Sequence, residues 1–191
     1  VIGAGHPAEQ EIRAVAEISA LSLIKISTRS EARANWIADR LKDVEIEIRF
    51  TSAEDAVRGS DIVTTVTPSE TPLVRDGWVD EGTHISAMGA DDIGKYELDT
   101  AILRRASLYA DYPRQSVVIG EFQHAFHDGL LNSVDEICAL GSVTLGESPG
   151  RSSKEQMTVV DSSGIATQDL AVAGAILEEA RQSDQVQYID F

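Results

Sequence analysis

The chain opens on the stretch Val1-Ile2-Gly3-Ala4-Gly5-His6-Pro7-Ala8-Glu9-Gln10. A Gly-x-Gly-x-x-Gly/Ala turn normally follows a buried strand and begins a helix whose N-terminal N–H groups bind a pyrophosphate. Gly3 would make the tight turn, Gly5 would let the backbone approach the pyrophosphate, and Ala8 would allow close helix–strand packing. The stretch therefore predicts a dinucleotide-binding turn formed by Gly3, Ala4, Gly5, His6 and Ala8. Taken alone, it fits an ordinary loop before a helix equally well.

The residues after this turn supply the context that the dinucleotide motif requires. Residues 8–20 carry apolar side chains at helical spacing, and residues 21–26 form a short apolar run suited to a buried parallel strand. A turn, a helix and a strand within roughly thirty residues favour dinucleotide binding over a chance pair of glycines. Only two residues precede Gly3, so we expect the chain to begin inside its first strand, as part of a longer protein.

The remaining sequence alternates between strand and helix patterns. Strands are predicted at residues 45–50, 61–66, 84–88, 108–110 and 157–160, and helices at 30–42, 52–58, 98–105, 117–127, 134–145 and 164–181. This alternation predicts an α/β fold, a Rossmann-type doubly wound parallel sheet. We expect one dinucleotide-binding domain over residues 1–191, with residues from about 182 onward leading back towards a further domain. Ligands of such sheets bind at the carboxyl ends of the strands, which selects the loops 3–8, 27–30, 67–70, 89–94 and 161–164.

Composition limits the classes of partner. A formal net charge of −16 at pH 7 argues against nucleic acids and anionic membranes, which require clustered basic side chains. No apolar run approaches the roughly 18 residues of a membrane span. Cys138 is the only cysteine, so no intrachain disulfide can form, and we expect a cytoplasmic location.

The end of the second strand bears on the choice of cofactor. NAD-specific domains usually place an acidic residue there to hold the ribose diol, whereas this chain has Ser27-Thr28-Arg29-Ser30. Hydroxyl groups and a guanidinium suit a 2′-phosphate better, because arginine forms paired hydrogen bonds with phosphate oxygens. Thr28 and Arg29 therefore favour NADP over NAD, although Arg29 equally fits a solvated residue at a helix start.

The segment Gly89-Ala90-Asp91-Asp92-Ile93-Gly94-Lys95 follows the predicted strand 84–88. A carboxylate there could act as a general acid or base, or steady a developing iminium cation. Asp91 or Asp92 could equally cap a turn. Met88 and Gly89 would lie next to a nicotinamide, although filling the core is an alternative for Met88. His124 and His127 have a spacing that metals accept, but no third ligand matches them, so we predict no metal.

Four segments, taken together, resemble the ornithine cyclodeaminase/mu-crystallin family. They are Gly3-x-Gly5 with Gln10, Thr67-Pro68-Ser69, the segment from Gly89 to Leu98, and Asp161-Ser162-Ser163-Gly164-Ile165-Ala166-Thr167-Gln168-Asp169-Leu170. Their order and spacing agree with the family, and the resemblance covers nearly the whole chain. Ile93 departs from it, because the family commonly has proline there.

The resemblance implies a reaction class. Family members use NAD(P) to oxidise an amino acid to an imine or to reduce an imine. In cyclodeaminases the hydride leaves the α-carbon, ammonia is expelled as the ring closes, and the hydride returns. Asp91 matches the family's acidic residue that handles protons at the amine. The resemblance also implies that Thr67 and Ser69 line the nicotinamide ribose, with Pro68 as a further cofactor-binding residue, and that Ser162, Ser163, Gly164 and Ile165 pass close to the nicotinamide ring.

The same resemblance leaves alternatives open. An alanine dehydrogenase or ketimine reductase would share the chemistry with a net redox change, and a relative similar to mu-crystallin would bind NADPH and a small ligand without catalysis. The family's substrate-binding arginine and lysine residues and its dimer interface belong to an upstream domain. We therefore expect a small amino acid or cyclic imine as the substrate, and a homodimer for the complete protein.

Overall fold

The computed structural model describes residues 1–183. Within these residues, a five-stranded parallel sheet has the order β3-β4-β7-β5-β6, with bounds Ile62–Thr65, His84–Ala87, Thr158–Asp161, Ser107–Ala110 and Ile137–Ala139. Next to it, β1 (Leu23–Ile26) and β2 (Glu47–Phe50) form a parallel pair. Residues from about 182 onward are predicted to lead back towards a further domain. Apart from residues 182 and 183, this stretch lies outside the described residues.

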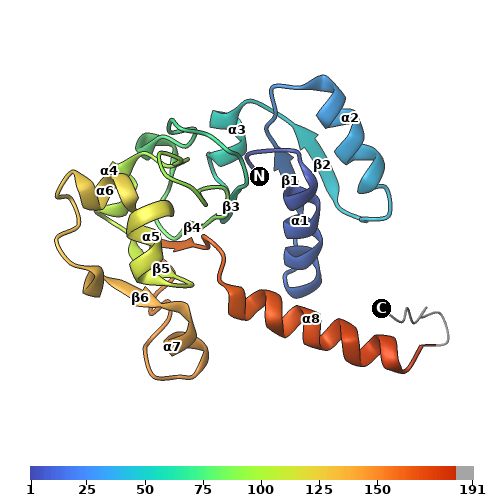
Figure 1. Cartoon of the computed structure of the whole chain (residues 1–191). Coiled ribbons are helices and arrows are strands. Elements are labelled where there is room, and N and C mark those ends of the chain that lie inside the picture. The colour runs from blue at the N-terminus through green and yellow to red at the C-terminus, as the bar shows by residue number, and fades with distance from the viewer. Residues whose placement is uncertain (184–191) are drawn as a thin grey trace.

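The first strand is reduced to Ile2, which joins the two groups of strands: it forms parallel bridges with Ser27, just after β1, and with Thr65, at the end of β3. The N-terminus accordingly lies between β1 and β3 (Figure 1). The Ile2 N–H donates to the Thr64 carbonyl at 2.8 Å, and the Ile2 carbonyl accepts from the Val66 N–H at 3.0 Å. The strand order is therefore β2-β1-Ile2-β3-β4-β7-β5-β6, and the predicted doubly wound parallel sheet is confirmed.

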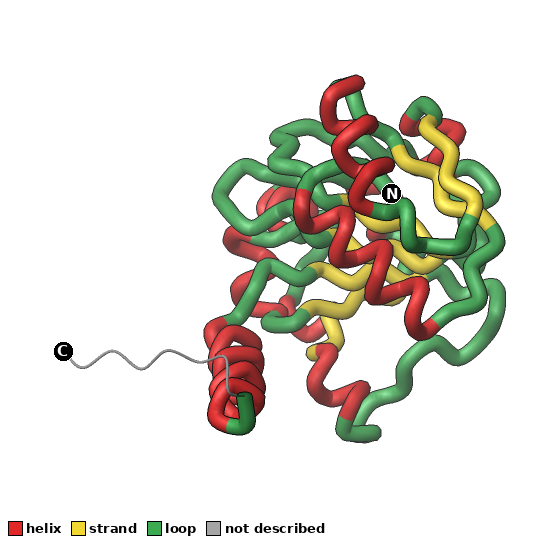
Figure 2. Tube along the Cα trace, turned by 90° about the vertical axis from the view of Figure 1, so that its right-hand side faces the viewer, coloured by secondary structure: helices red, strands yellow, loops and turns green. Residues whose placement is uncertain are grey.

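Helices connect these strands, as Figure 2 shows along the chain trace. Their bounds are α1 His6–Ile18, α2 Glu31–Arg40, α3 Ala53–Val57, α4 Thr100–Leu103, α5 Pro113–Ile119, α6 Gln123–His127, α7 Leu140–Thr144 and α8 Ala166–Arg181. Ser30 and Ser52 cap α2 and α3, because each side chain accepts a backbone N–H from the first turn. Ala8, Ile12 and Ile37 pack α1 and α2 on β1, while a larger core centred on Ile85 and Val159 lies under the five-stranded sheet.

The single helix predicted over residues 117–127 is wrong, because α5 ends at Ile119 and α6 begins at Gln123. The break lies at Gly120, where an added Cβ would come 2.7 Å from the Ser116 Cα and 3.0 Å from the Asp161 Cγ. Glu121 follows and points into the interior, where its side chain is fully buried. Tertiary contacts therefore override a continuous helical pattern at this point.

The helix predicted over residues 134–145 is also wrong. A 3-10 turn (Val134–Glu136), the strand β6 and the short helix α7 replace it. Cys138 lies in β6 and pairs with Tyr109 of β5. A short apolar run is ambiguous between helix and strand, and here the free edge of β5 decides for strand.

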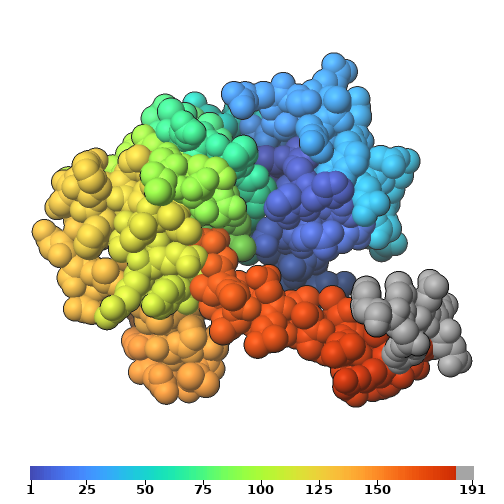
Figure 3. Space-filling view, in the orientation of Figure 1, coloured from blue at the N-terminus to red at the C-terminus, as the bar shows by residue number. Residues whose placement is uncertain are grey.

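Helix α8 projects from the rest of the described residues, below α1 in this view (Figure 3). Its apolar side chains Leu170, Val172, Ile176 and Leu177 are between 53% and 73% exposed. Several exposed apolar side chains on one helix are typical of a surface that contacts another part of a protein. Within residues 1–183, no helix combines the length and the apolar character that crossing a bilayer demands.

Candidate functional site

The loops selected from the sequence meet at one edge of the sheet. Thr65 of β3 lies opposite Ala87 of β4, which lies opposite Asp161 of β7, so these three parallel strands end side by side. Ile2 lies on the other side of Thr65 and is followed directly by the glycine turn. The loops after Ile2, β1, β3, β4 and β7 therefore lie next to one another, as the ligand site of a doubly wound sheet requires.

The glycine turn has the backbone that the motif predicts. Gly3 has a φ of +117°, and an added Cβ would lie 3.0 Å from both Cγ2 and the carbonyl oxygen of Val66. Gly5 is the N-cap of the 13-residue helix α1, and no side chain caps that helix end. Ala8 is fully buried, so the helix packs closely at this point. An uncapped helix N-terminus behind a glycine turn fits a pyrophosphate, because its N–H groups and its dipole attract anions.

The loop after β1 carries the residues that bear on cofactor choice. The Thr28 hydroxyl accepts the Ser30 N–H at 3.3 Å, which shapes the start of α2. Arg29 is exposed, and among residues 1–183 it takes part in no ion pair. The exposed His6 ring lies edge-on to the Trp36 ring, with centroids 4.6 Å apart. The guanidinium of Arg29 is therefore available to a phosphate group.

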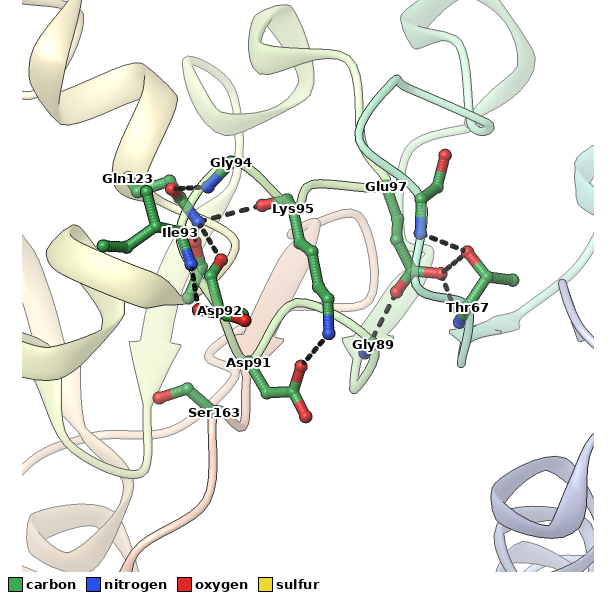
Figure 4. A network of polar contacts seen from close by, with 12 residues as sticks. Thr67, Gly89, Asp91, Asp92, Ile93, Gly94, Lys95, Glu97, Gln123 and Ser163 are labelled. Atoms are coloured by element: carbon green, nitrogen blue, oxygen red, sulfur yellow. Dashed lines mark hydrogen bonds and ion pairs between the residues drawn. The ribbon is translucent and has the colours of Figure 1, made fainter.

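The loop after β3 turns its threonine inward. Both the N–H and the hydroxyl of Thr67 donate to Glu97 Oε1, at 2.7 and 2.6 Å (Figure 4). The Thr67 hydroxyl also accepts the Ser69 N–H at 3.3 Å, and the Ser69 hydroxyl donates to the Thr71 carbonyl. Pro68 is exposed between them. The hydroxyl groups of Thr67 and Ser69 are thus both engaged in hydrogen bonds within the protein.

The loop after β4 presents Asp91 to solvent. Met88 and Gly89 are partly buried where the strand ends, and the Asp91 side chain is 59% exposed. Lys95 Nζ donates to Asp91 Oδ1 at 2.6 Å, and this bond raises the pKa of Lys95. Asp92 instead turns its carboxylate back to accept the Ile93 N–H at 2.8 Å. Both carboxylates are exposed, but an ammonium group fixes the position of Asp91, whereas Asp92 is bonded to the backbone of its own turn.

Gln123 of α6 holds this loop in shape. Its Oε1 accepts the Gly94 N–H at 2.7 Å, and its Nε2 donates to the carbonyls of Asp92 and Lys95 at 3.1 and 2.9 Å (Figure 4). His124 lies 3.2 Å from the Gly94 carbonyl through Nε2. These bonds constrain the loop although it has Ile93 where the family commonly has proline.

The turn after β7 is held by two side chains, one directly after β5 and one from α5. Asp111 Oδ2 accepts the Ser162 hydroxyl at 3.1 Å and the Gly164 N–H at 2.8 Å. Gln115 Nε2 donates to Ser163 Oγ at 3.1 Å and to the Gly164 carbonyl at 2.6 Å. Gly164 has a φ of +83°, and Ile165 is the N-cap of α8. Residues 162–165 therefore form a fixed turn beside the loop of Asp91.

Three carboxyl groups are buried behind these loops. Glu97, Glu121 and Asp161 are all fully buried or nearly so. Burial raises the pKa of each, and for Asp161 it does so to about 7 despite a hydrogen bond from Ser116 and one from the Glu121 backbone. Asp161 Oδ1 has no hydrogen-bond partner within the described residues. At neutral pH this cluster therefore carries less negative charge than three fully ionised carboxyl groups would.

Asp161→Asn is expected to remove part of the pH dependence of stability. A folded-state pKa of about 7 against an ordinary value of 3.8 means that the folded protein binds a proton which the unfolded chain releases. Stability from this group is therefore full below pH 4 and falls as pH rises to about 7. Relative to the parent, the free energy of unfolding of the variant should rise by roughly 2–4 kcal/mol between pH 4 and pH 8. Urea unfolding across this pH range measures the effect, and parallel curves for the two proteins would contradict it.

Sequence reasoning found the loops but missed most side chains that hold them. Lys95 and Glu97 lie inside the segment 89–98 that resembles the family. Their charged side chains were the feature of the sequence that could have identified them as site residues. Asp111, Gln115 and Gln123 come from α5, α6 and the end of β5, between 28 and 53 residues away from the atoms that they hold. A single sequence has no pattern that marks such long-range bonds.

Comparison with known proteins identifies the family and several relatives of the chain. The model of the ornithine cyclodeaminase/mu-crystallin family matches residues 1–184. Among curated proteins, iminosuccinate reductase of Paracoccus denitrificans is 34% identical over 190 residues, which are 100% of this chain and 59% of that protein. Alanine dehydrogenase of Archaeoglobus fulgidus is 37% identical over 179 residues, or 94% of this chain and 55% of that protein.

A solved structure has the same fold and a related sequence. It is an archaeal alanine dehydrogenase dimer with bound NAD, with a TM-score of 0.93 and 36% identity, and the match covers 100% of this chain and 59% of that one. The chain thus spans somewhat more than half the length of these relatives.

Proposed function

Because the chain belongs to the ornithine cyclodeaminase/mu-crystallin family, we propose that its protein is an enzyme that uses a nicotinamide dinucleotide to act on an amino acid or a cyclic imine. The reaction proposed first is a cyclodeamination, in which an amino acid with a side-chain amine loses its α-amino group as ammonia and closes a ring. The observation that carries the proposal is Asp91, an exposed carboxylate at the edge where the glycine turn and the loops 67–69 and 162–165 meet.

The proposed cofactor site follows the loops in order. Gly3, Ala4, Gly5, His6 and Ala8 with the N-terminus of α1 would hold the pyrophosphate, Thr28 and Arg29 the adenosine ribose, and residues 67–69 the second ribose. Met88, Gly89 and residues 162–165 would surround the nicotinamide. When bound, the nicotinamide would supply a hydride acceptor in its oxidised form and a hydride donor in its reduced form.

Asp91 would manage the protons of the substrate. An α-ammonium group must lose a proton before its nitrogen can form a C=N bond, and a carboxylate within reach can take that proton. The departing amine needs a proton in turn, which the same carboxyl group can return. Lys95 Nζ, at 2.6 Å, would hold the Asp91 carboxylate towards the substrate.

A dehydrogenase is the second candidate, favoured by the similarity to alanine dehydrogenase and iminosuccinate reductase. In that case water would take the imine to an oxo acid, with net formation of reduced cofactor. A third reading, an NADPH- and ligand-binding protein without catalysis, has less support because such a protein has no use for an exposed Asp91.

Stoichiometry separates these candidates. The full-length protein that carries this chain would be incubated with ornithine or alanine and a small amount of NAD(P), while ammonia and reduced cofactor are followed together. We expect ammonia in large excess over reduced cofactor. Equal amounts of the two would make the protein a dehydrogenase, and binding without either product would favour the non-catalytic reading.

We propose a preference for NADP, which rests on the exposed Arg29 and on the absence of an acidic residue in 27–30. NADPH is therefore expected to bind at least about fivefold more tightly than NADH, since a charge-assisted bond to phosphate contributes on the order of 1–2 kcal/mol. Arg29→Leu should remove this difference by weakening NADPH alone. Fluorescence titration measures both constants, and an unchanged ratio in the variant would sink the assignment of Arg29.

We also propose that the complete protein is a homodimer, in keeping with the dimeric archaeal alanine dehydrogenase. The exposed apolar side chains of α8 support an extended contact with other parts of the assembly. Light scattering on the full-length protein should give twice the chain mass, and a monomeric mass at micromolar concentration would contradict the proposal.

A further inference from the structure

We propose that Glu97 and Glu121 form a two-carboxylate clamp that fixes the nicotinamide end of the site, with Glu97 as a positioning residue between the loop after β3 and the loop after β4. The inference deepens the proposed function and rests on it. Neither glutamate reaches the surface, so neither touches a substrate directly. Their effect would come through the backbone that they hold.

Glu97 divides its two oxygens between two loops (Figure 4). Oε1 accepts both the N–H and the hydroxyl of Thr67, at 2.7 and 2.6 Å, while Oε2 accepts the Gly89 N–H at 3.0 Å. A Cβ added to Gly89 would lie 2.6 Å from the Glu97 Cδ, so glycine is needed for this close approach. The width of one carboxylate thus sets the distance between the two loops.

Glu121 holds Glu97 in turn. Its Oε1 accepts the N–H groups of Glu97 and Leu98 at 2.9 and 2.7 Å, and its Oε2 lies 3.0 Å from the same Glu97 nitrogen. Among residues 1–183, neither glutamate is in an ion pair with a cation. Burying two carboxyl groups without a cation is costly, and hydrogen bonds from backbone N–H groups are what offsets this cost.

Backbone hydrogen bonds hold the same segments together. The carboxyl group of Glu97 is therefore not needed for the fold to form. The backbone carbonyl of Glu97 accepts the N–H groups of Leu73 and Val74 at 2.7 and 3.0 Å. The Met88 N–H donates to the Thr65 carbonyl at 2.9 Å and continues the pairing of β3 with β4. What the side chain adds is the relative position of Thr67 and Gly89, and Gly89 lies two residues before Asp91.

This position matters for chemistry. The loop of Thr67 would hold the nicotinamide ribose, and the loop of Gly89 carries the proposed proton-transferring group. A displacement of about 1 Å between reacting groups can cost on the order of 100-fold in rate. The clamp therefore acts first on the nicotinamide half of the site, whereas the residues at the N-terminus of α1, which would hold the pyrophosphate, are not among the hydrogen-bond partners of Glu97 and Glu121 in the described part of the chain.

Glu97→Gln tests the clamp, because glutamine keeps the shape but has one acceptor oxygen for two loops. In the full-length protein we expect the dissociation constant of NADH or NADPH to rise at least about tenfold, since one acceptor oxygen is lost and an amide N–H opposes a backbone N–H. ADP-ribose or its 2′-phosphate, which lacks the nicotinamide, should bind within about twofold of the parent. Glu121→Gln should shift the same ratio in the same direction and serves if Glu97→Gln does not fold.

A core substitution of comparable cost to stability is the matched control. Ile102→Val removes one methyl group from a fully buried side chain on α4 and should leave the ratio of the two dissociation constants unchanged. If Glu97→Gln weakened the binding of both nucleotides equally, or of neither, the clamp would be overturned while the proposed function stayed intact. A parent protein that binds neither nucleotide would instead refute the proposed function.

Amide exchange in the protein without cofactor gives a second readout that does not depend on binding. In Glu97→Gln, the amides of Thr67 and Gly89 should exchange at least about tenfold faster, because their acceptors are disturbed. The amides of Leu73 and Val74, which donate to the Glu97 carbonyl, should keep their protection. Unchanged exchange at Thr67 and Gly89 would overturn the inference.

Discussion

Replacing Asp91 by asparagine is expected to lower turnover at least about 100-fold, with the dissociation constant of the reduced cofactor within about twofold of the parent. Asparagine has nearly the same shape and can still accept the hydrogen bond from Lys95, but it cannot take a proton from the substrate amine. Steady-state kinetics together with a cofactor titration measures both quantities in the full-length protein.

Asp92→Asn is the matched control for this experiment. Asp92 is the neighbouring carboxylate, and its Oδ1 accepts the Ile93 N–H rather than facing the site. An asparagine can accept the same bond, so turnover should fall less than about threefold. If Asp91→Asn kept most of the turnover, Asp91 would be a turn residue and the proposed mechanism would be wrong.

Gly89→Ala is expected to have the largest effect on stability and on cofactor affinity together. The new Cβ would lie 2.6 Å from the Glu97 Cδ and closer still to the Thr67 carbonyl oxygen, so one of the two loops must move. Glu97 cannot withdraw, because three hydrogen bonds hold its carboxylate. We expect a loss on the order of 3 kcal/mol in the free energy of unfolding and at least about tenfold weaker cofactor binding.

Gly77→Ala is the control for the added methyl group. Gly77 has no atom within 4 Å of an added Cβ, and its φ is not positive. Its free energy of unfolding should change by less than about 0.5 kcal/mol. Urea unfolding of both variants measures the difference, and equal stabilities for the two would show that the close approach at Gly89 is not needed.

The features of the fold that local pattern determines were predictable from the sequence. The glycine turn, the strands at β1, β3, β4, β5 and β7 and the serine cap of α2 depend on residues that are close together in the chain. The break at Gly120 and the strand β6 were not predicted, because each depends on a distant partner. Gly120 packs against the Asp161 carboxyl group, and β6 pairs with β5.

The candidate site divides in the same way. Asp91 and the loops around it follow from motif spacing and from the rule that ligands bind at the carboxyl ends of parallel strands. The buried acids behind the loops do not, since a glutamate in a sequence is more often exposed than buried. Glu136 lies in a local Ser-x-x-Glu capping pattern with Ser133, whereas the sequence around Glu121 has no pattern that marks this residue as buried.

An amino acid that carries deuterium at its α-carbon tests the proposed reaction most directly. The full-length protein would be given α-deuterated ornithine with a trace of NAD(P), and the product and the cofactor would be analysed by mass spectrometry. We expect a cyclic amino acid that retains the deuterium on its α-carbon, because in a cyclodeamination the hydride returns to the carbon that it left. An oxo acid without deuterium, formed with an equal amount of deuterated reduced cofactor, would contradict it.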